Sequence, residues 1–390
     1  MLPSASPAPR VSQKRPPFPP NELPRCPPAG KCATMADMDP LPREGVDART
    51  KRREGAPKMR AMVLAAGYGT RLRPLTEHTP KPLIPLFDRP LFSYHLAWLA
   101  QGGVEGVVMN AHHRADRLIE AVSAGKTPMA VEVVHEPEIL GSGGGIGNVR
   151  DFFAGAGSFL VMNGDILVDL DLEDLVAFHR RRGGIATMVL RPDPDVSRFG
   201  AIGIEEDGRV RRIVSILPPW HGPLTEYIFT GIHLFEEAIF DFIEPGERGC
   251  IVHDIYPRLF AAGLPVYGFV TEGFWADLGT PRRYLDAHFE LLRRPTGVYA
   301  DAVRSGRDRV HPSLWIGAEA LVPEETRRTT ELVVGARARI GRGARLSHTL
   351  VWAGSEVSAG VSLDQAIVTP YETIRIRTGL PAEGRDSRSV

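Results

Sequence analysis

The chain has 390 residues, of which 43% are hydrophobic and 24% are charged, a composition typical of a soluble globular protein. Its 47 basic and 47 acidic side chains cancel, and no apolar run is long enough to cross a bilayer, so we expect neither nucleic-acid nor membrane partners. The cysteines Cys26, Cys32 and Cys250 lack metal-ligand spacing, which favours a reducing, cytoplasmic setting.

Residues 1–58 differ in composition from the rest of the chain. They hold a large share of the 34 prolines and almost no aliphatic periodicity. Such a segment buries too little apolar surface to offset the entropy of ordering it, so we expect a disordered tail. A docking role for this tail competes with a start codon assigned too early, and we favour the second interpretation, with Met59 as the native start.

The stretch from Ala61 to Leu86 reads AMVLAAGYGTRLRPLTEHTPKPLIPL. Its short apolar beginning predicts a buried strand, which ends in a glycine-rich loop. Glycine lets backbone N–H groups approach an oxyanion, while Arg71 and Lys81 add positive charge, so the stretch predicts a polyphosphate site. Neither the Walker pattern nor the dinucleotide fingerprint fits, because Lys81 lies too far on and Leu72 replaces the third glycine.

From residue 59 to about 300, short aliphatic runs alternate with amphipathic segments, which predicts a doubly wound α/β domain with a mixed, mostly parallel sheet and a Rossmann-like core. The expected strands are Met62–Ala66, Gly106–Asn110, Val131–His135, Phe159–Met162, Ala186–Leu190, Tyr227–Leu234 and Val266–Val270. The expected helices are Leu91–Gln101, Ala115–Ser123, Leu172–Arg182, Glu236–Phe242, Val252–Ala262 and Pro281–Leu292. Ligands of such sheets bind at the carboxyl ends of the strands.

Residues 310–372 show a different period, in which one aliphatic residue recurs about every six positions. Val334, Ile340 and Leu346 are spaced in this way, and the series continues to Val368 with two five-residue steps. The pattern predicts a short left-handed parallel β-helix, whereas an antiparallel meander would alternate by two. Because an exposed coil edge must be covered, we expect a homo-oligomer formed through this domain. Residues 376–390 are expected to form a flexible tail.

Two aspartates in the sequence are candidates for a functional role. Asp165 follows the strand Phe159–Met162, and a carboxylate at a strand end suits Mg²⁺, although N-G-D alone also makes a good turn. In the segment W-A-D-L-G-T-P, helix capping by Thr280 and Pro281 accounts for the last residues but leaves Asp277 unexplained.

These motifs together resemble the sugar-1-phosphate nucleotidylyltransferases, a family that includes mannose-1-phosphate guanylyltransferases, glucose-1-phosphate thymidylyltransferases and N-acetylmuramate-1-phosphate uridylyltransferases. Leu64–Thr76 matches L-A-A-G-x-G-T-R-L-x-P-L-T, and Pro80–Pro85 matches P-K-P-L-x-P. The resemblance implies an enzyme that transfers a nucleotidyl group from an NTP to a sugar 1-phosphate, giving an NDP-sugar and pyrophosphate, with Mg²⁺ as cofactor. The nucleophile is already an anion, so no general base is required.

The resemblance also implies roles for individual residues. Catalysis falls to Arg71, Lys81, Asp165 and Asp277, of which Asp165 and Asp277 hold the metal. The nucleotide-binding residues are Leu64, Ala65, Ala66, Gly67, Gly69, Thr70, Arg71, Lys81, Gly141, Gly144 and Asp165. The sugar-binding residues are Gly145, Asn163, Thr230, Gly231 and Trp275. The glycines from Gly141 onward are expected to form a loop against the base and sugar of the nucleotide.

The substrate is left open between two interpretations. The β-helix favours GDP-mannose-type or related NDP-hexose synthesis, which we rank first. The triple glycine at 143–145, and the absence from Val214–Pro223 of the lysine that many relatives carry in an E-K-P triplet, favour uridylyl transfer to an N-acetylamino sugar 1-phosphate. Without that lysine, Arg191 or Arg198 would have to bind the acceptor phosphate.

Two alternatives belong to other functional classes. A regulatory homologue that binds NDP-sugars without catalysis would be expected to lack one of the four catalytic residues, and all four are present. An acyltransferase would need a histidine over a long β-helix, and His348 over a few short rungs supports this poorly.

Overall fold

The structure is a computed structural model that describes residues 59–376, apart from 126, 195, 197–199, 215, 218–219, 307 and 309–310. The expected tails, 1–58 and all but the first residue of 376–390, lie outside the described residues, as does Arg198. Within the described ranges, no helix is both long and apolar enough to span a membrane.

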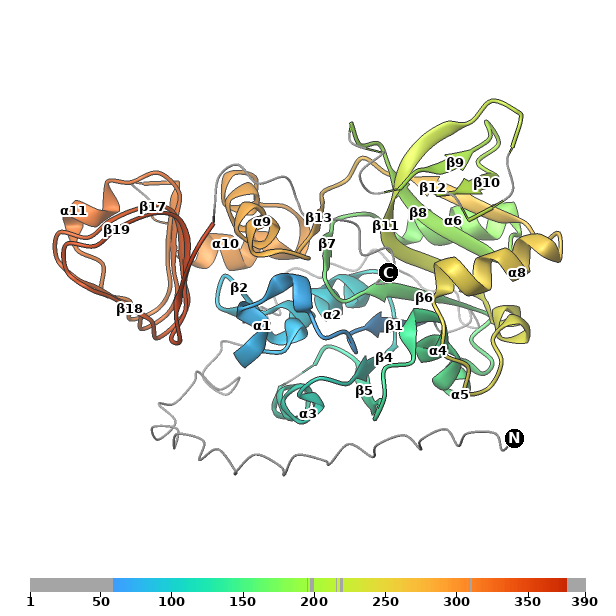
Figure 1. Cartoon of the computed structure of the whole chain (residues 1–390), viewed down its shortest axis with the longest axis horizontal. Helices are drawn as coiled ribbons and strands as arrows, with labels where there is room; N and C mark the ends of the chain where they lie inside the picture. Colours follow the sequence, from blue (N-terminus) through green and yellow to red (C-terminus); the bar gives the residue numbers. More distant parts are fainter. Residues whose placement is uncertain are drawn as a thin grey trace, which may run out of the picture.

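A nine-stranded sheet forms the centre of the molecule, in the order β10-β9-β11-β6-β1-β4-β5, with β8 beside β11 and β12 beside β8 (Figure 1). Strand β1 pairs in parallel with both β4 and β6, while β11 runs antiparallel to β6 and β8. The strands are β1 Arg60–Leu64, β4 Gly106–Ala111, β5 Ala130–His135, β6 Ser158–Asn163, β8 Ala186–Arg191, β9 Ile202–Ile204, β10 Val210–Ile213, β11 Thr225–Glu236 and β12 Val266–Val270.

Helices cover both faces of this sheet. The alternation of side chains along β1 sends Ala61 and Val63 into one core cluster and Met62 into another. The first cluster includes side chains of α2 (Leu91–Gln101), α3 (Ala115–Ala124) and α6 (Leu172–Arg182). The second includes α4 (Gly141–Asn148), α5 (Arg150–Phe153) and α8 (Tyr256–Ala261). The predicted doubly wound α/β core is therefore confirmed.

The remaining elements of the described residues are the long helix α9, several shorter helices, four short strands and the C-terminal elements. They are η2 Thr70–Leu72, α1 Leu75–His78, η3 Lys81–Leu83, β2 Pro85–Leu86, β3 Arg89–Pro90, β7 Ile166–Val168, η4 Glu237–Phe242, η5 Ile251–Ile255, β13 Trp275–Asp277, α9 Pro281–Arg293, η6 Gly297–Tyr299 and α10 Ala300–Gly306. The C-terminal elements are β14 Leu314–Ile316, α11 Glu324–Arg327, β15 Leu332–Val334, β16 Arg339–Ile340, β17 Arg345–Val351, β18 Glu356–Val357, β19 Ser362–Val368 and β20 Thr373–Arg375.

Two of the predicted helices differ from the observed elements. The segment predicted as Glu236–Phe242 is a 3-10 helix that begins at Glu237. The segment predicted as Val252–Ala262 begins with a π-helical turn, Ile251–Ile255, before α8. Pro257 explains the irregular start, because it has no N–H to bond the preceding turn.

The C-terminal domain, which we define as Leu314–Ile376, consists of strands that stack in parallel. Leu314 pairs with Leu332, Leu332 pairs with Thr349, and Val351 pairs with Val368, so each strand lies nearly three hexads after its partner. Only the last pair, β19 with β20, is antiparallel. The parallel pairing differs from that of an antiparallel meander, and the left-handed β-helix stays a prediction. Helices α9 and α10 lie between this domain and the central sheet (Figure 1).

Candidate functional site

The glycine-rich loop begins at the carboxyl end of β1, in the middle of the parallel part of the sheet. The Leu64 carbonyl accepts a 2.9 Å hydrogen bond from the Gly164 N–H, and the Ala65 N–H donates to Asn110 Oδ1 at 2.7 Å. Gly69 has φ of +64°, a left-handed conformation that glycine adopts without strain. Around Gly67 there is open space, because a Cβ added there would meet no atom within 4 Å.

The two predicted cations come from the short 3-10 turns that follow this loop. Lys81 begins the second turn, and its Nζ lies 2.5 Å from Asp165 Oδ2, at the end of β6. Arg71 belongs to the first turn, and its Nη2 would lie 3.4 Å from a Cβ added to Gly279. The same Cβ would lie 2.6 Å from Asp277 Oδ1. The structure therefore brings all four predicted catalytic residues to one place.

A small antiparallel pair, β7 with β13, places the two aspartates beside each other. Asp277 is the register partner of Ile166, and the Leu278 N–H donates to the Asp165 carbonyl at 2.8 Å. The Asp277 carboxylate accepts from the Gly279 N–H and from Arg283 Nη1, both at 2.5 Å. Neither strand was predicted from the sequence, because each has only three residues.

The surroundings of the two carboxylates shift their pKa values in opposite directions. Burial alone would raise the pKa of Asp165, but the Lys81 ammonium and the Arg71 guanidinium outweigh it and lower that pKa below its usual value. The pKa of Asp277 is raised, first by burial and second by the negative charge of Asp165, against the opposing charge of Arg283. The Asp277 carboxylate is therefore buried beside the negative charge of Asp165, a situation that a divalent cation relieves.

The donor set fits the predicted Mg²⁺. This ion keeps several waters and takes one or two protein carboxylates together with phosphate oxygens, and Asp165 with Asp277 supply such a pair. Among the described residues, no group of three or more His, Cys, Asp or Glu side chains could hold a metal by itself, so the donor set does not suit a closed Zn²⁺ site.

The glycines after Leu140 form helix α4 and not the predicted loop. Packing explains this difference, because α4 lies against the backbone of the segment 247–249. A Cβ on Gly141 would stand 2.5 Å from the Gly249 carbonyl oxygen, and one on Gly144 would stand 2.3 Å from that of Glu247. Gly145 is equally confined, at 2.9 Å from Asn110 Nδ2. The low intrinsic helix propensity of glycine is overridden because only glycine permits this close approach.

Four of the five predicted sugar-binding residues lie around a bulge in β11, between Phe229 and His233, while Gly145 lies in α4 beside Asn110. Gly231 has φ of +90°, and a Cβ there would contact Asn163 Nδ2 at 2.8 Å. The Thr230 hydroxyl, which is buried, donates to the Val189 carbonyl at 2.8 Å, and the Trp275 indole N–H donates to the Thr230 carbonyl at 2.7 Å. The structure brings these four residues together, with the Thr230 side chain bonded inside the protein.

Arg191 lies at the carboxyl end of β8, on the same side of the sheet. Its guanidinium carbon is 5.6 Å from the centre of the Trp275 ring, and its Nη1 donates to the Trp275 carbonyl at 3.3 Å. Since Trp275 and Asp277 are two residues apart on β13, their side chains lie on the same face of that strand. Of the two arginines considered for the acceptor phosphate, Arg191 is thus connected to the predicted site.

The predicted site residues do not include Asn110 and Glu136, whose side chains hold the glycine loop through hydrogen bonds. Asn110 Nδ2 donates to Glu136 Oε1 at 2.8 Å, and Glu136 Oε2 accepts from the Leu140 N–H at 3.1 Å. Both side chains are buried, so a polar chain runs from Ala65 to the start of α4. The signal in the sequence was a pair of polar residues at the ends of two adjacent aliphatic runs.

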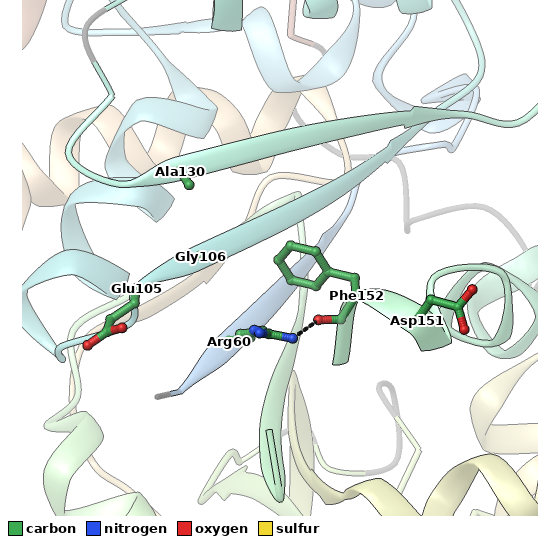
Figure 2. Close-up of a pocket in the computed structure, with 6 residues that line it drawn as sticks. All are labelled: Arg60, Glu105, Gly106, Ala130, Asp151 and Phe152. Atoms are coloured by element: carbon green, nitrogen blue, oxygen red, sulfur yellow. Dashed lines mark hydrogen bonds between the residues drawn. The ribbon is translucent and has the colours of Figure 1, made fainter. Parts of the chain in front are cut away.

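A surface cavity lies at the opposite edge of the sheet, where β1, β4 and β5 begin (Figure 2). Arg60, Glu105, Gly106 and Phe152 are among the six residues that line it, and Arg60 donates to the Phe152 carbonyl. None of the six is a predicted site residue. The cavity therefore has no part in the site at the carboxyl ends.

Residues 60–294 match the family model described as Nucleotidyl transferase. The mannose-1-phosphate guanylyltransferase of Mycobacterium tuberculosis is 32% identical over 78% of this chain and 83% of that protein. The UTP--glucose-1-phosphate uridylyltransferase of Synechocystis is 28% identical over 80% of this chain and 87% of that protein. Among solved structures, HddC from Yersinia pseudotuberculosis complexed with GMP-PN superposes with a TM-score of 0.51 and 26% identity, covering 60% of this chain and 99% of that chain.

Proposed function

Since the chain belongs to the nucleotidyl transferase family, as a sugar-1-phosphate nucleotidylyltransferase, we propose that it makes an NDP-hexose of the GDP-mannose type in a Mg²⁺-dependent reaction. The observation that supports this best is the convergence of Lys81, Arg71 and two carboxylates at the carboxyl ends of β1 and β6. Positive charge and a divalent-cation site side by side are what a nucleoside triphosphate requires.

The reaction is a substitution at phosphorus. An oxygen of the sugar 1-phosphate attacks the α-phosphorus of the NTP, and the bond from that phosphorus to the bridging oxygen of the β-phosphate breaks. Pyrophosphate leaves with the electron pair. Because the attacking oxygen is already anionic, catalysis consists of alignment and charge neutralisation. We assign Lys81 to the α-phosphate and Arg71 to the leaving pyrophosphate.

Mg²⁺, when bound, would neutralise charge on the phosphate oxygens, and Asp165 and Asp277 would hold it. Positively charged side chains near the two aspartates favour the ionised carboxylates that bind the metal. Lys81 and Arg71 keep Asp165 ionised, and Arg283 opposes the burial and charge repulsion that raise the pKa of Asp277. The positive charges thus serve both the substrate and the metal ligands.

Guanylyl transfer to mannose 1-phosphate ranks first among the possible substrates. It is supported by the Mycobacterium tuberculosis relative, which matches over most of both chains, and by the fold match to a protein solved with GMP-PN. Uridylyl transfer is the second candidate, supported by the Synechocystis relative and by the missing acceptor lysine. In either case Arg191 is the side chain we propose for the acceptor side.

The test is pyrophosphate release from four NTPs against the 1-phosphates of mannose, glucose, N-acetylglucosamine and N-acetylmuramic acid, with Mg²⁺. Asp165→Ala serves as the blank, and Glu356→Gln, which removes an exposed carboxylate of the C-terminal domain, serves as the matched control. We expect release with GTP and mannose 1-phosphate that is absent in the blank and retained in the control. Nucleotide binding without release in any combination would instead support a regulatory homologue.

A further inference from the structure

The hairpin formed by β2 and β3 follows directly on the turn that carries Lys81. The Ile84 N–H donates to the Lys81 carbonyl at 3.2 Å, and the Leu91 N–H donates to the Ile84 carbonyl at 3.0 Å. The tip of the hairpin is formed by Phe87 and Asp88, with φ of 48° and 62°. Asp88 is one of the few residue types that tolerate this left-handed conformation.

The carboxylate of Asp88 reaches into the C-terminal domain. Its Oδ2 accepts a 2.6 Å hydrogen bond from the Ala336 N–H. A Cβ added to Gly317 would lie 2.4 Å from Oδ2, and one added to Gly335 would lie 2.6 Å from Oδ1. These two glycines follow β14 and β15 at matching positions, so the stacked strands leave a slot that the carboxylate fills.

Apolar contacts reinforce this connection. The rings of Phe87 and Trp315 lie 5.5 Å apart in an edge arrangement. Ile84, Leu86 and Phe87 belong to the same buried cluster as Trp315, Val333, Leu350, Trp352 and Ile367 of the C-terminal domain. That cluster also includes Leu72, the residue next to Arg71. One core therefore extends from the predicted catalytic turns into the stacked strands.

Helix α9 supplies a second connection at the base of the hairpin. The Tyr284 hydroxyl donates to the Pro85 carbonyl, and the Trp352 indole N–H donates to the Tyr284 oxygen at 3.1 Å. Tyr94 of α2 donates to the Leu86 carbonyl at 2.6 Å. In Figure 1 the C-terminal strands accordingly lie beside α9, on the side of β2.

We propose that Asp88 is a positioning residue through which the C-terminal domain holds the Lys81 turn in register with Asp165. The proposal rests on the proposed function, because it assigns Lys81 to the α-phosphate. When the hairpin tip is seated in its slot, the turn has no freedom to move away from the end of β6. When the tip is released, Lys81 loses alignment, and a displacement of about 1 Å can lower a rate about a hundredfold.

The surroundings of Asp88 show which of its properties matters. Burial raises its pKa to about 6, against the Ala336 N–H and the positive charge of Arg337, while the other ionisable groups that interact with it, Tyr94 and Tyr284, are hydroxyls. The negative charge is therefore a cost, and the docking depends on size, conformation and an acceptor oxygen. Asparagine has all three.

The variants separate the negative charge of Asp88 from its size, its backbone conformation and its acceptor oxygen. Asp88→Asn keeps the left-handed turn and an acceptor oxygen, whereas Asp88→Gly keeps the turn and removes the group in the slot. Glu319→Gly is the matched control, since Glu319 is an exposed acidic residue of the C-terminal domain with φ of +59°. Should Asp88→Gly fail to fold, Asp88→Glu replaces it, because the longer side chain does not fit between Gly317 and Gly335.

The experiment measures kcat and KM of the full chain with GTP and mannose 1-phosphate, together with GTP affinity by calorimetry. Asp88→Gly is expected to lower kcat about tenfold to a hundredfold with little change in KM for the sugar phosphate, while Asp88→Asn and Glu319→Gly stay within about twofold of wild type. Unchanged kcat and GTP affinity in Asp88→Gly would overturn the proposal. An inactive wild type would refute the proposed function instead, and the coupling would then be decided by whether Asp88→Gly weakens GTP affinity.

Discussion

Gly144 is packed tightly against the protein backbone, whereas Gly67 faces open space. We therefore expect Gly144→Ala to affect stability and Gly67→Ala to affect nucleotide binding. In Gly144→Ala the new methyl group would lie 2.3 Å from the Glu247 carbonyl oxygen and 3.0 Å from Leu140 Cβ. The clash is with a backbone oxygen that cannot rotate away, so the cost lies near the upper end of the range of about 1–3 kcal/mol for overpacking, and the better helix propensity of alanine offsets about 1 kcal/mol of it. The net loss of roughly 2 kcal/mol corresponds to a melting temperature lower by roughly 4–8 °C.

Gly67→Ala should behave in the opposite way. Its methyl group meets nothing within 4 Å, so stability should change by less than about 0.5 kcal/mol. The methyl group would instead occupy the space that we assign to the triphosphate, and we expect KM for the nucleotide to rise about tenfold, equivalent to about 1.4 kcal/mol.

Thermal unfolding of the two variants tests the packing of α4, and their steady-state kinetics test the part of the glycine loop in nucleotide binding. An unchanged melting temperature for Gly144→Ala would show that α4 does not lie against the segment 247–249 as described. A normal KM for Gly67→Ala would remove the glycine loop from the nucleotide site. The two variants control for each other, since both add one methyl group to a glycine of the same region.

Four further predictions follow from the site. Lys81→Gln should lower kcat about 10²- to 10³-fold with an unchanged circular dichroism spectrum, and normal turnover would exclude Lys81 from the reaction. Arg283→Met removes a positive charge that lowers the pKa of Asp277, so this pKa should rise. The acidic limb of the pH–rate profile should then move to higher pH, and a limb that stays in place would contradict the role of Asp277. Treatment with EDTA should abolish activity and added Mg²⁺ should restore it, whereas activity that survives EDTA would refute the metal dependence. The Asp277→Asn variant should need a Mg²⁺ concentration about tenfold higher than wild type. Asn110→Asp should destabilise the protein by about 1–3 kcal/mol in urea unfolding, because a second carboxylate would face Glu136, and unchanged stability would show that the buried chain from Ala65 to α4 is unimportant.

The sequence predicted the regular elements well where the periodic pattern was long. Helices Leu91–Gln101 and Leu172–Arg182 have the predicted ends, and the latter is capped by Asp171, whose side chain accepts from the Glu173 N–H. Such helices are set by local amphipathicity and capping, which the sequence contains directly. The strands at the centre of the sheet differ from prediction by one or two residues at their ends.

Prediction was wrong where distant contacts decide the conformation. The glycines from Gly141 to Gly147 read as a loop because glycine is a poor helix former, and only the backbone at 247–249, about a hundred residues on, shows why they form a helix. The pair β7 with β13 was missed for a different reason, because a strand of three residues is too short to show an alternating pattern. Yet this pair is what places Asp277 beside Asp165.

The candidate site was predicted through its charged residues and not through the residues that position them. Arg71, Lys81, Asp165 and Asp277 stand in motifs that can be recognised one letter at a time. Asn110 and Glu136 act through hydrogen bonds that join different segments of the chain, so a pattern within one segment does not mark them. Arg283 pairs with Asp277, but this ion pair joins α9 to β13, and no regular period links the two residues. A buried polar side chain becomes interpretable only when its partner is known.

The same reasoning explains why the sugar is harder to identify than the reaction. Among the predicted sugar-binding residues, the Thr230 hydroxyl and the Trp275 indole N–H form hydrogen bonds inside the protein. What they fix is the backbone around Gly231, whose φ of +90° and close approach to Asn163 shape the surface that a sugar would meet. Selectivity that depends on backbone shape changes with small shifts of strands and loops while the letters stay the same. Relatives named for mannose 1-phosphate and for glucose 1-phosphate therefore match this chain at 32% and 28% identity over similar shares of its length, 78% and 80%.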